Sequence, residues 1–256
     1  MTLMIARRML GAEFLKLRKK RGTVIWSLLL AVASAIVYFV YAELRRSSGQ
    51  QPPGGLDGFR HGLELVGIIM APLAAVLIGA EAGAGDTSAG VFRDLVVTGR
   101  SRAALFAVRV PGALLLTWLV VSLSYAAVVA GTLVFVGSQP LPTLAHVLQG
   151  WGWALLVDGA VCAAAVGLAS LTQSRPATIT ALIGFELVAS PLLLQTHSLG
   201  LARDALLEAS VVKTAPIPLH IGPVVRESSA LAVIVLALWV LIAIALGAWR
   251  TQRADA

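Results

Sequence analysis

The chain has 256 residues, of which 58% are apolar or aromatic and only 13% are charged, and its mean hydropathy is +0.86. Soluble domains carry about 25% charged residues, and disordered chains combine low hydrophobicity with high charge. The composition therefore excludes a disordered chain and a single soluble domain. It predicts an all-α membrane protein that crosses the bilayer several times.

Residues 2–20 precede the first long apolar run, and their pattern predicts an amphipathic helix. Apolar side chains recur at spacings of three and four, which places them on one helix face; they are Leu3, Ala6, Leu10, Phe14 and Leu17. The basic residues lie off this face, so we expect the helix to lie in the plane of the membrane surface. The alternative interpretation is a basic cluster that only orients the first span.

Six apolar runs are long enough to cross the hydrocarbon region, which takes about 20 residues. Together they make residues 1–256 one transmembrane domain, with spans at about 23–42, 63–80, 110–136, 151–171, 177–194 and 230–249. The third run exceeds what a bilayer requires, which predicts that it tilts or projects into water. Pro72 interrupts the second run.

The distribution of basic residues predicts the orientation of these spans. With the N-terminus in the cytoplasm, most of the 20 lysines and arginines fall on the cytoplasmic side, as the positive-inside rule requires. Both termini are therefore expected in the cytoplasm. The net charge of +7 is explained by topology, and no nucleic-acid partner is expected.

Residues 81–103 form a long predicted cytoplasmic loop. Phe92, Leu95 and Val96 fall at positions i, i+3 and i+4, which predicts one or two turns of amphipathic helix ending at Gly99. Apolar and basic side chains facing the cytoplasm are typical of a docking element for another protein. The alternative is an ordinary basic loop between two spans.

The outer segment 195–229 is too long for a structureless connection in a compact protein. Its first half is helical in composition, and Pro216 and Pro218 then interrupt it. We expect a short interfacial helix or a shallow re-entrant segment there.

Motifs for catalysis and for nucleotide binding are absent from the sequence. It contains no Gly-x-x-x-x-Gly-Lys-Ser/Thr, His-Glu-x-x-His or Gly-x-Ser-x-Gly run. The four histidines are scattered over predicted outer loops and span edges, and we interpret them as isolated solvated side chains; they are His61, His146, His197 and His220. No catalytic residue, metal ion or cofactor is therefore expected in this chain.

Two carboxylates lie inside predicted spans, namely Asp158 and Glu186. A charge at a helix centre costs about 2.5–3.5 kcal/mol on insertion scales, so each is a candidate functional residue. They either line a polar pathway or bind a cationic substrate, or they are neutral or hydrogen-bonded structural groups. Both interpretations stand for Glu186, and the structural one is favoured for Asp158.

Small residues form a ridge along the fourth predicted span, where Gly159, Ala163 and Gly167 recur every four positions. Such a ridge lets helix backbones approach closely in lipid. The pattern predicts helix packing, either within the subunit or across a dimer.

The whole layout resembles the membrane subunit of an ABC-2 type ABC transporter. The N-terminal helix carries Glu13-Phe14-Leu15-Lys16-Leu17-Arg18 and precedes six spans and a long first loop. The family's pattern in and after that loop is acidic-x-x-x-Gly-Thr, then Thr-Pro-x-Ser-Arg, then Lys. This sequence is similar to it, with Asp86-x-x-x-Gly90-Val91, then Thr98-Gly99-Arg100-Ser101-Arg102, then Arg109. The residues that differ from that pattern are Asp86, Val91, Gly99 and Arg109.

This resemblance implies two contact elements for a separate ABC ATPase subunit, present in two copies, which binds ATP and Mg. A coupling helix would fall at about residues 87–98, with contacts from Asp86, Gly90, Val91, Phe92, Arg93, Asp94, Leu95, Thr98, Gly99, Arg100 and Arg102. A connecting helix would fall at 2–20, with contacts from Glu13, Phe14, Lys16, Leu17 and Arg18. It further implies a second permease copy, identical or related, and re-entrant outer helices in segment 195–229.

The function implied is export of a hydrophobic or amphipathic compound (a drug, antibiotic, peptide or lipid-like molecule) across the bacterial cytoplasmic membrane. The alternative is a proton-coupled secondary transporter or an intramembrane enzyme that uses Glu186. An ABC permease stops working without its ATPase, whereas a proton-coupled carrier stops with an uncoupler.

Overall fold

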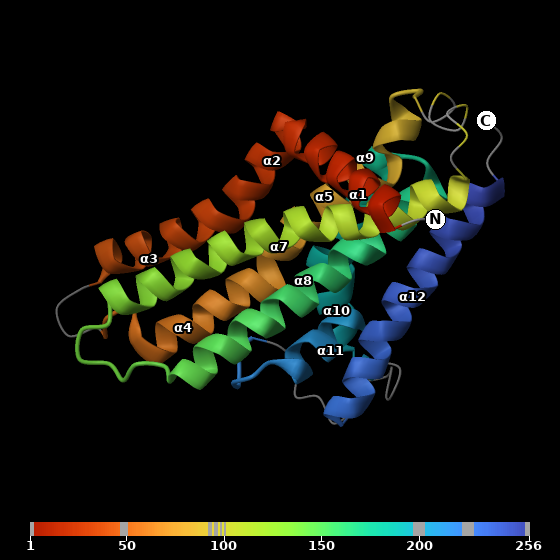
Figure 1. The fold of residues 1–256 in the computed structure, drawn as a ribbon. Helices are drawn as coiled ribbons and strands as arrows, with labels where there is room; N and C mark the ends of the chain where they lie inside the picture. Colours follow the sequence, from red (N-terminus) through yellow and green to blue (C-terminus); the bar gives the residue numbers. More distant parts are fainter. Residues whose placement is uncertain are drawn as a thin grey trace.

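The computed structural model describes residues 3–46, 51–91, 94, 97, 99, 101–196, 203–221 and 228–253. Every regular element within these ranges is a helix (Figure 1). Six of the described helices are long and apolar enough to cross a membrane: Arg21–Arg45, Gly55–Ser88, Arg102–Val134, Leu144–Thr172, Arg175–Gln195 and Ser229–Arg253. The predicted all-α class is thus confirmed, and six of the described helices are long and apolar enough for the six predicted spans.

Three of the six spans contain a short π-helical turn between two α-helices. The first span comprises α2 (Arg21–Leu28), η1 (Leu29–Ala33) and α3 (Ser34–Arg45); the second α4 (Gly55–Glu64), η2 (Leu65–Ile69) and α5 (Ala71–Ser88); the fifth α9 (Arg175–Gly184), η3 (Phe185–Ala189) and α10 (Ser190–Gln195). The third, fourth and sixth spans are the single helices α7 (Arg102–Val134), α8 (Leu144–Thr172) and α12 (Ser229–Arg253). Two further helices, α1 (Leu3–Lys19) and α11 (Leu207–Thr214), are shorter than a span.

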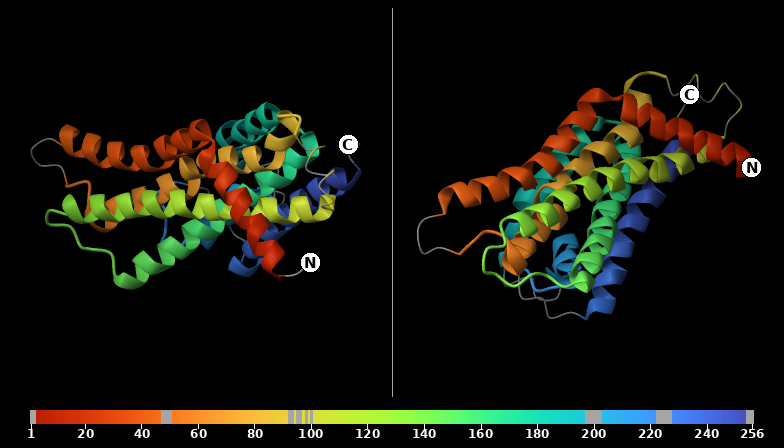
Figure 2. Two further views of the ribbon diagram at one scale, coloured as in Figure 1. Left: turned by 45° about the horizontal axis from the view of Figure 1, so that its top comes forward. Right: turned by 60° about the vertical axis from the view of Figure 1, so that its left-hand side comes forward.

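Successive spans run in opposite directions, so α1 and the last turn of α12 lie at the same end of the bundle (Figures 1 and 2). A hydrogen bond from Arg102 at the start of α7 to the Gln252 carbonyl near the end of α12 shows that these helix ends meet. We call this end the α1 end and the opposite end, where α4 begins, the α4 end. The N-terminal helix α1 and the last turn of α12 thus lie on the same side of the bundle.

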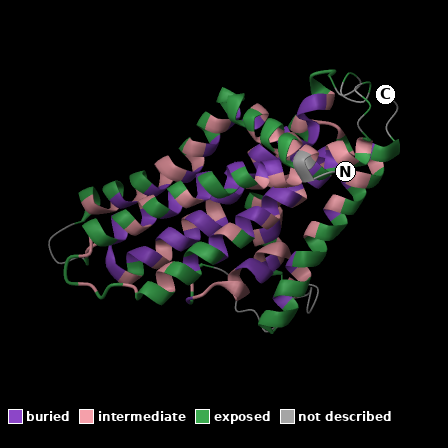
Figure 3. Ribbon diagram, viewed as in Figure 1, coloured by how far each residue is buried: buried purple, intermediate pink, exposed green. Residues whose placement is uncertain are grey.

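The centre of the bundle is built by α5 and α8, whose residues are mostly buried (Figure 3). Gly79 and Gly83 of α5 face the α8 backbone, and a Cβ at Gly83 would lie 2.5 Å from the Val166 carbonyl oxygen. Small residues at a spacing of four allow this close approach. Large apolar side chains such as Trp26, Leu119 and Ile242 are exposed on the outer faces, as expected where helices face lipid rather than water.

The ridge of small residues on α8 packs within the subunit. Gly167 lies against α12, where a Cβ at Gly247 would contact the Gly167 carbonyl oxygen well inside van der Waals distance. Gly159 lies beside the Trp118 indole of α7. The ridge therefore packs helices together within the subunit, which is one of the two alternatives that the sequence left open.

The second span extends further than expected in both directions, to Gly55–Ser88 instead of 63–80. Pro72 is the second residue of α5, a position where a missing N–H costs nothing, so it starts a new helix rather than ending the span. At the other end residues 81–88 are helical, not part of a loop as expected, because small residues pack on α8 and the acidic ones are paired. The third span, 33 residues or ~50 Å long, is likewise longer than the bilayer core.

The outer segment contains α11, which packs back into the bundle. Trp153 of α8 donates from Nε1 to the Val211 carbonyl (3.3 Å) and to Thr214 Oγ1 (3.3 Å). Trp153 is about 14 Å along α8 from the first residue of that helix. The helix expected between residues 195 and 229 thus lies beside the spans, well inside the α4 end.

The N-terminal helix α1 crosses α7 near its start (Figure 2). Gly112 permits this crossing, because a Cβ there would lie 2.7 Å from Glu13 Cγ. Leu17 is buried and Phe14 half-buried on the side facing the bundle, whereas Arg18 and Lys19 are exposed. The side chains of Leu3 and Ala6, two members of the expected apolar stripe, lie outside the described residues.

Candidate functional site

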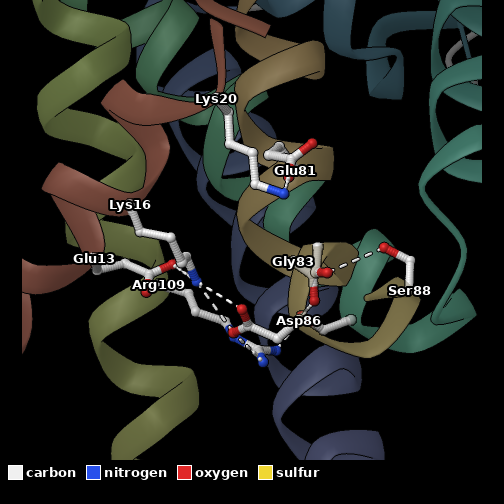
Figure 4. A network of polar contacts seen from close by, with 10 residues as sticks. Glu13, Lys16, Lys20, Glu81, Gly83, Asp86, Ser88 and Arg109 are labelled. Carbon is white, nitrogen blue, oxygen red and sulfur yellow. Dashed lines mark hydrogen bonds and ion pairs between the residues drawn. The ribbon is translucent and has the colours of Figure 1, made fainter. Parts of the chain in front are cut away.

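A buried ion-pair network lies at the α1 end, where side chains from separate helices meet (Figure 4). Its first centre is Asp86 of α5, whose side chain is 8% exposed. Lys16 of α1 lies 3.0 Å from Asp86 Oδ1, and Arg109 of α7 lies 3.3 Å from Asp86 Oδ2. Arg109 also donates to the Gly83 carbonyl at 3.1 Å. One carboxylate therefore connects α1, α5 and α7.

The second centre is Glu81, one and a half turns earlier in α5 and 3% exposed. Arg175, the first residue of α9, lies 2.6 Å from Glu81 Oε2, and Lys20, between α1 and α2, lies 3.2 Å from Glu81 Oε1. Thr23 of α2 is 3.5 Å from Glu81 and accepts a hydrogen bond from Arg175. The Glu81 carboxylate thus joins the first, second and fifth spans.

The arrangement of this network explains why buried charge is tolerated here. Two acidic side chains project from the second half of α5, and each has two cationic partners from other segments of the chain. A buried charge is costly unless it is paired and hydrogen-bonded, and both conditions are met. The two carboxylates therefore connect separate parts of the chain through ion pairs.

The residues expected to form a coupling element fall into four groups. Asp86 and Arg102 are held within the protein, Asp86 in the network and Arg102 against α12. Gly90 and Gly99 adopt left-handed backbone conformations with φ of 72° and 80°, which glycine accommodates without strain. Val91 and Asp94 are exposed, and so is Val97 (79%), which lies within the expected coupling helix but was not among its expected contacts. Outside the described residues lie Phe92, Arg93, Leu95, Thr98 and Arg100.

The residues expected in the connecting helix divide between the two faces of α1. Glu13 lies 2.7 Å from Lys16, and both point toward the network. Phe14 and Leu17 pack against the bundle core. Arg18 is exposed and is the expected contact that faces solvent.

The two intramembrane carboxylates occupy different surroundings. Asp158 of α8 is fully buried, and among the described residues neither of its carboxylate oxygens has a hydrogen-bond partner. Glu186 lies in the π-helical turn η3 and lines a cavity of about 210 Å³ between α8, α9, α11 and α12. The other lining side chains are apolar. Glu186 is also within electrostatic range of both Asp158 and Glu208 of α11.

The cavity beside Glu186 combines apolar walls with one carboxyl group. The π turn matters because it adds a residue to the helix and shifts the side chains that follow around its axis. Such turns are frequent at functional sites, and no pattern in the sequence signals this one.

Sequence reasoning missed two features of the structure. It took Glu81 for a loop residue and did not connect it to Arg175 or Lys20, because these partners lie far away in the sequence. It also interpreted all histidines as isolated, and this is wrong for His61 and His220, whose rings stack with centroids 4.2 Å apart. Their separation along the chain gives no local signal of the contact.

Comparisons with known proteins do not assign the chain to a family. No protein-family model matches the sequence, and no curated protein matches it either.

Proposed function

We propose that the chain is the membrane-spanning permease subunit of an ATP-binding cassette exporter of the ABC-2 type. In this proposal a separate ATPase subunit, in two copies, supplies ATP hydrolysis with Mg, and a second permease copy completes the transporter. The α1 end faces the cytoplasm of a bacterium, and the spans lie in its inner membrane. The fold agrees with this proposal, because it has six spans and an additional N-terminal helix on the side of both termini.

The observation that carries the proposal is the position of Asp86 between Lys16 and Arg109. Residues 89–101 connect α5 to α7, and α1 lies across the start of α7. The Lys16–Asp86–Arg109 contacts therefore fasten α1 to both helices that flank this connection. A partner that pushes on residues 89–101 or on α1 moves the same three helices together, which is what power transmission by an external ATPase requires.

The charges at the α1 end support the cytoplasmic orientation. Lys16, Lys20, Arg102, Arg175 and Arg253 all lie at this end among the described residues. Basic residues concentrate on the cytoplasmic side of spans. In-plane placement of α1 follows from the same orientation, since its exposed cations would then contact anionic lipid head groups.

The apolar character of the interior supports a hydrophobic or amphipathic cargo such as a drug, an antibiotic, a peptide or a lipid-like compound. The cavity beside Glu186 is lined by apolar side chains except for that carboxylate. Pockets lined in this way favour ligands that are themselves largely apolar.

The experiment that tests the proposal is purification of the tagged chain from native membranes in mild detergent, with mass spectrometry of co-purifying proteins. We expect a stoichiometric protein with a Walker motif, and we expect Val97→Asp to abolish its recovery. Leu141→Asp is the matched control, since Leu141 is an exposed apolar residue in the loop at the α4 end. Recovery of the chain alone in several detergents would overturn the proposal.

The cavity beside Glu186 favours a second candidate function, namely a proton-coupled carrier or an intramembrane enzyme that uses this carboxylate. Transport by such a carrier would continue without any ATPase and would stop with an uncoupler. Glu186→Gln would abolish it, whereas unchanged transport and an unchanged substrate range in this variant would make Glu186 a packing residue.

A further inference from the structure

A cluster of two histidines and two carboxylates lies at the α4 end, opposite the ion-pair network. Asp57, His61 and Glu64 come from α4, and His220 comes from the segment between α11 and α12. Asp57, His61 and His220 each offer a ligand atom within 4.8 Å of the others. Because Asp57 and His61 are four residues apart, they share one face of α4. A residue 163 positions further along the chain completes the cluster.

Glu64 holds His220 in a defined orientation. Its side chain is 4% exposed, and its Oε1 accepts hydrogen bonds from the backbone N–H groups of His220 and Ile221. The same oxygen lies 3.2 Å from His220 Nδ1. An ionised carboxylate only accepts hydrogen bonds, so we assign the ring proton of His220 to Nδ1, which faces Glu64. This assignment leaves Nε2 free to bind another partner. In metal-binding histidines the far ring N–H is almost always held by a carboxylate, a backbone carbonyl or a water molecule, and Glu64 is such a carboxylate.

The other ring nitrogen of His220 faces Asp57. His220 Nε2 lies 2.9 Å from Asp57 Oδ1. A nitrogen lone pair and a carboxylate oxygen repel one another at this distance, so a cation, either a proton or a metal ion, has to lie between them. His61 brings a second imidazole to the same place, with its Nδ1 3.7 Å from Asp57 Oδ2 and 3.0 Å from the Asp57 carbonyl oxygen.

We propose that Asp57, His61 and His220 bind a divalent transition-metal ion of the Zn²⁺ class, with Glu64 as a positioning residue. Two imidazoles and one carboxylate suit such an ion, whereas Ca²⁺ and Mg²⁺ prefer oxygen ligands alone. Tetrahedral ligands of Zn²⁺ lie about 3.3 Å apart, and each imidazole binds through a lone pair in its ring plane. Because the His61 and His220 rings are stacked, binding requires one imidazole to turn out of the stack so that the three groups, now within 4.8 Å of one another, face a common point. Three protein ligands leave a fourth position for water.

The bound ion would fasten α4 to the chain that enters α12. This proposal does not depend on the permease function, because the cluster lies at the other end of the bundle from the ion-pair network. It adds a site for a ligand that the sequence gave no reason to expect.

The test is isothermal titration of the full chain in detergent with ZnCl₂, together with the visible spectrum after addition of Co²⁺. The chain must carry an affinity tag without histidine, since a histidine tag binds both ions. We expect one Zn²⁺ per chain, and affinity at least tenfold weaker in His220→Ala and in His61→Ala. His146→Ala is the matched control, because His146 lies in the first turn of α8 at the same end, and it should bind as the wild type does.

Glu64 is tested through its action on His220. Glu64→Ala should weaken Zn²⁺ binding about 10- to 100-fold, the range seen for such carboxylate partners. Glu64→Gln should restore part of the affinity, because its amide oxygen still accepts from Nδ1–H. A role in folding alone would lower the thermal stability of both variants and leave the Zn²⁺ affinity of the folded fraction unchanged.

Two results would overturn the proposal. One is Zn²⁺ binding by the wild type no tighter than that of the His61→Ala/His220→Ala double variant. The other, which needs no variant to fold, is a wild-type Co²⁺ spectrum without the intense visible absorption of four-coordinate Co²⁺.

Discussion

Arg109 of α7 and Asp86 of α5 form an ion pair of 3.3 Å in which both side chains are more than nine-tenths buried. The pair lies where α1 crosses these two helices, and Lys16 adds a second cation to the same carboxylate. Removing one partner from a buried pair leaves an uncompensated charge, which costs far more than the pair contributes while intact. Single substitutions in the Lys16–Asp86–Arg109 contacts should therefore lower the stability of the protein.

Asp86→Asn should destabilise the protein by about 3 kcal/mol, because the buried Arg109 guanidinium loses the charge of Asp86. The measurement is the midpoint of thermal unfolding in detergent, followed by fluorescence-detected size exclusion. Asp94→Asn is the control, because Asp94 is an exposed carboxylate in the connection between α5 and α7. Equal midpoints for the two variants would contradict a stabilising role for the Asp86 pair.

The two cations beside Glu81 should show strong non-additivity. In Arg175→Ala the Glu81 carboxylate still has Lys20 at 3.2 Å, and in Lys20→Ala it still has Arg175 at 2.6 Å. The double variant leaves a buried carboxylate with neither cation. We expect its loss of stability to exceed the sum of the single losses by about 0.5–3 kcal/mol, the usual range for coupled neighbours.

A double-mutant cycle on thermal unfolding measures this coupling energy. Lys19→Ala combined with Arg175→Ala is the matched control, because Lys19 is an exposed lysine one position away from Lys20. Losses that simply add in both cycles would show that the contacts of Glu81 with Lys20 and Arg175 do not act together.

The helical class and the number of spans could be predicted because crossing a bilayer demands about 20 apolar residues, a signal that is local in sequence. The ion-pair network could not, because Lys16 and Asp86 are 70 residues apart and each looks like a loop or surface residue by itself. The same reason explains the missed contact between His61 and His220. Polarity in a helical membrane protein indicates a loop only when the charged groups have no partners on other helices.

The extent of the second span illustrates this limit. The run Glu81–Asp86 has a carboxylate at each end and alternating alanine and glycine between them, a composition typical of a loop. In the structure its glycines and alanines allow contact with α8, and its carboxylates are neutralised by α1, α7 and α9. The spacing of Gly79 and Gly83 was a readable sign of helix packing, whereas the π turn that carries Glu186 had no such sign.

Gly167→Ala should separate α12 from α8. A Cβ at Gly167 would overlap the backbone of Ala243, which cannot move as a flexible side chain can. Gly152→Ala in the same helix is the matched control, because a Cβ there meets nothing within 4 Å. We expect Gly167→Ala to lower the thermal midpoint and Gly152→Ala to leave it unchanged or to raise it, since alanine favours the helix by up to about 1 kcal/mol. Equal behaviour of the two variants would contradict the close contact between α8 and α12.

Trp153→Phe should release α11 from the bundle, because phenylalanine keeps much of the ring but lacks the N–H that donates to Val211 and Thr214. Cys162 is the only cysteine in the sequence and is buried, so a cysteine introduced at Val212 of α11 reports the accessibility of that helix. We expect faster maleimide labelling of Val212→Cys when Trp153→Phe is present. Trp151→Phe is the control, since Trp151 donates to Ser122 of α7 and does not contact α11 through its N–H. If both tryptophan variants label at the wild-type rate, the hydrogen bonds of Trp153 do not hold α11 in place.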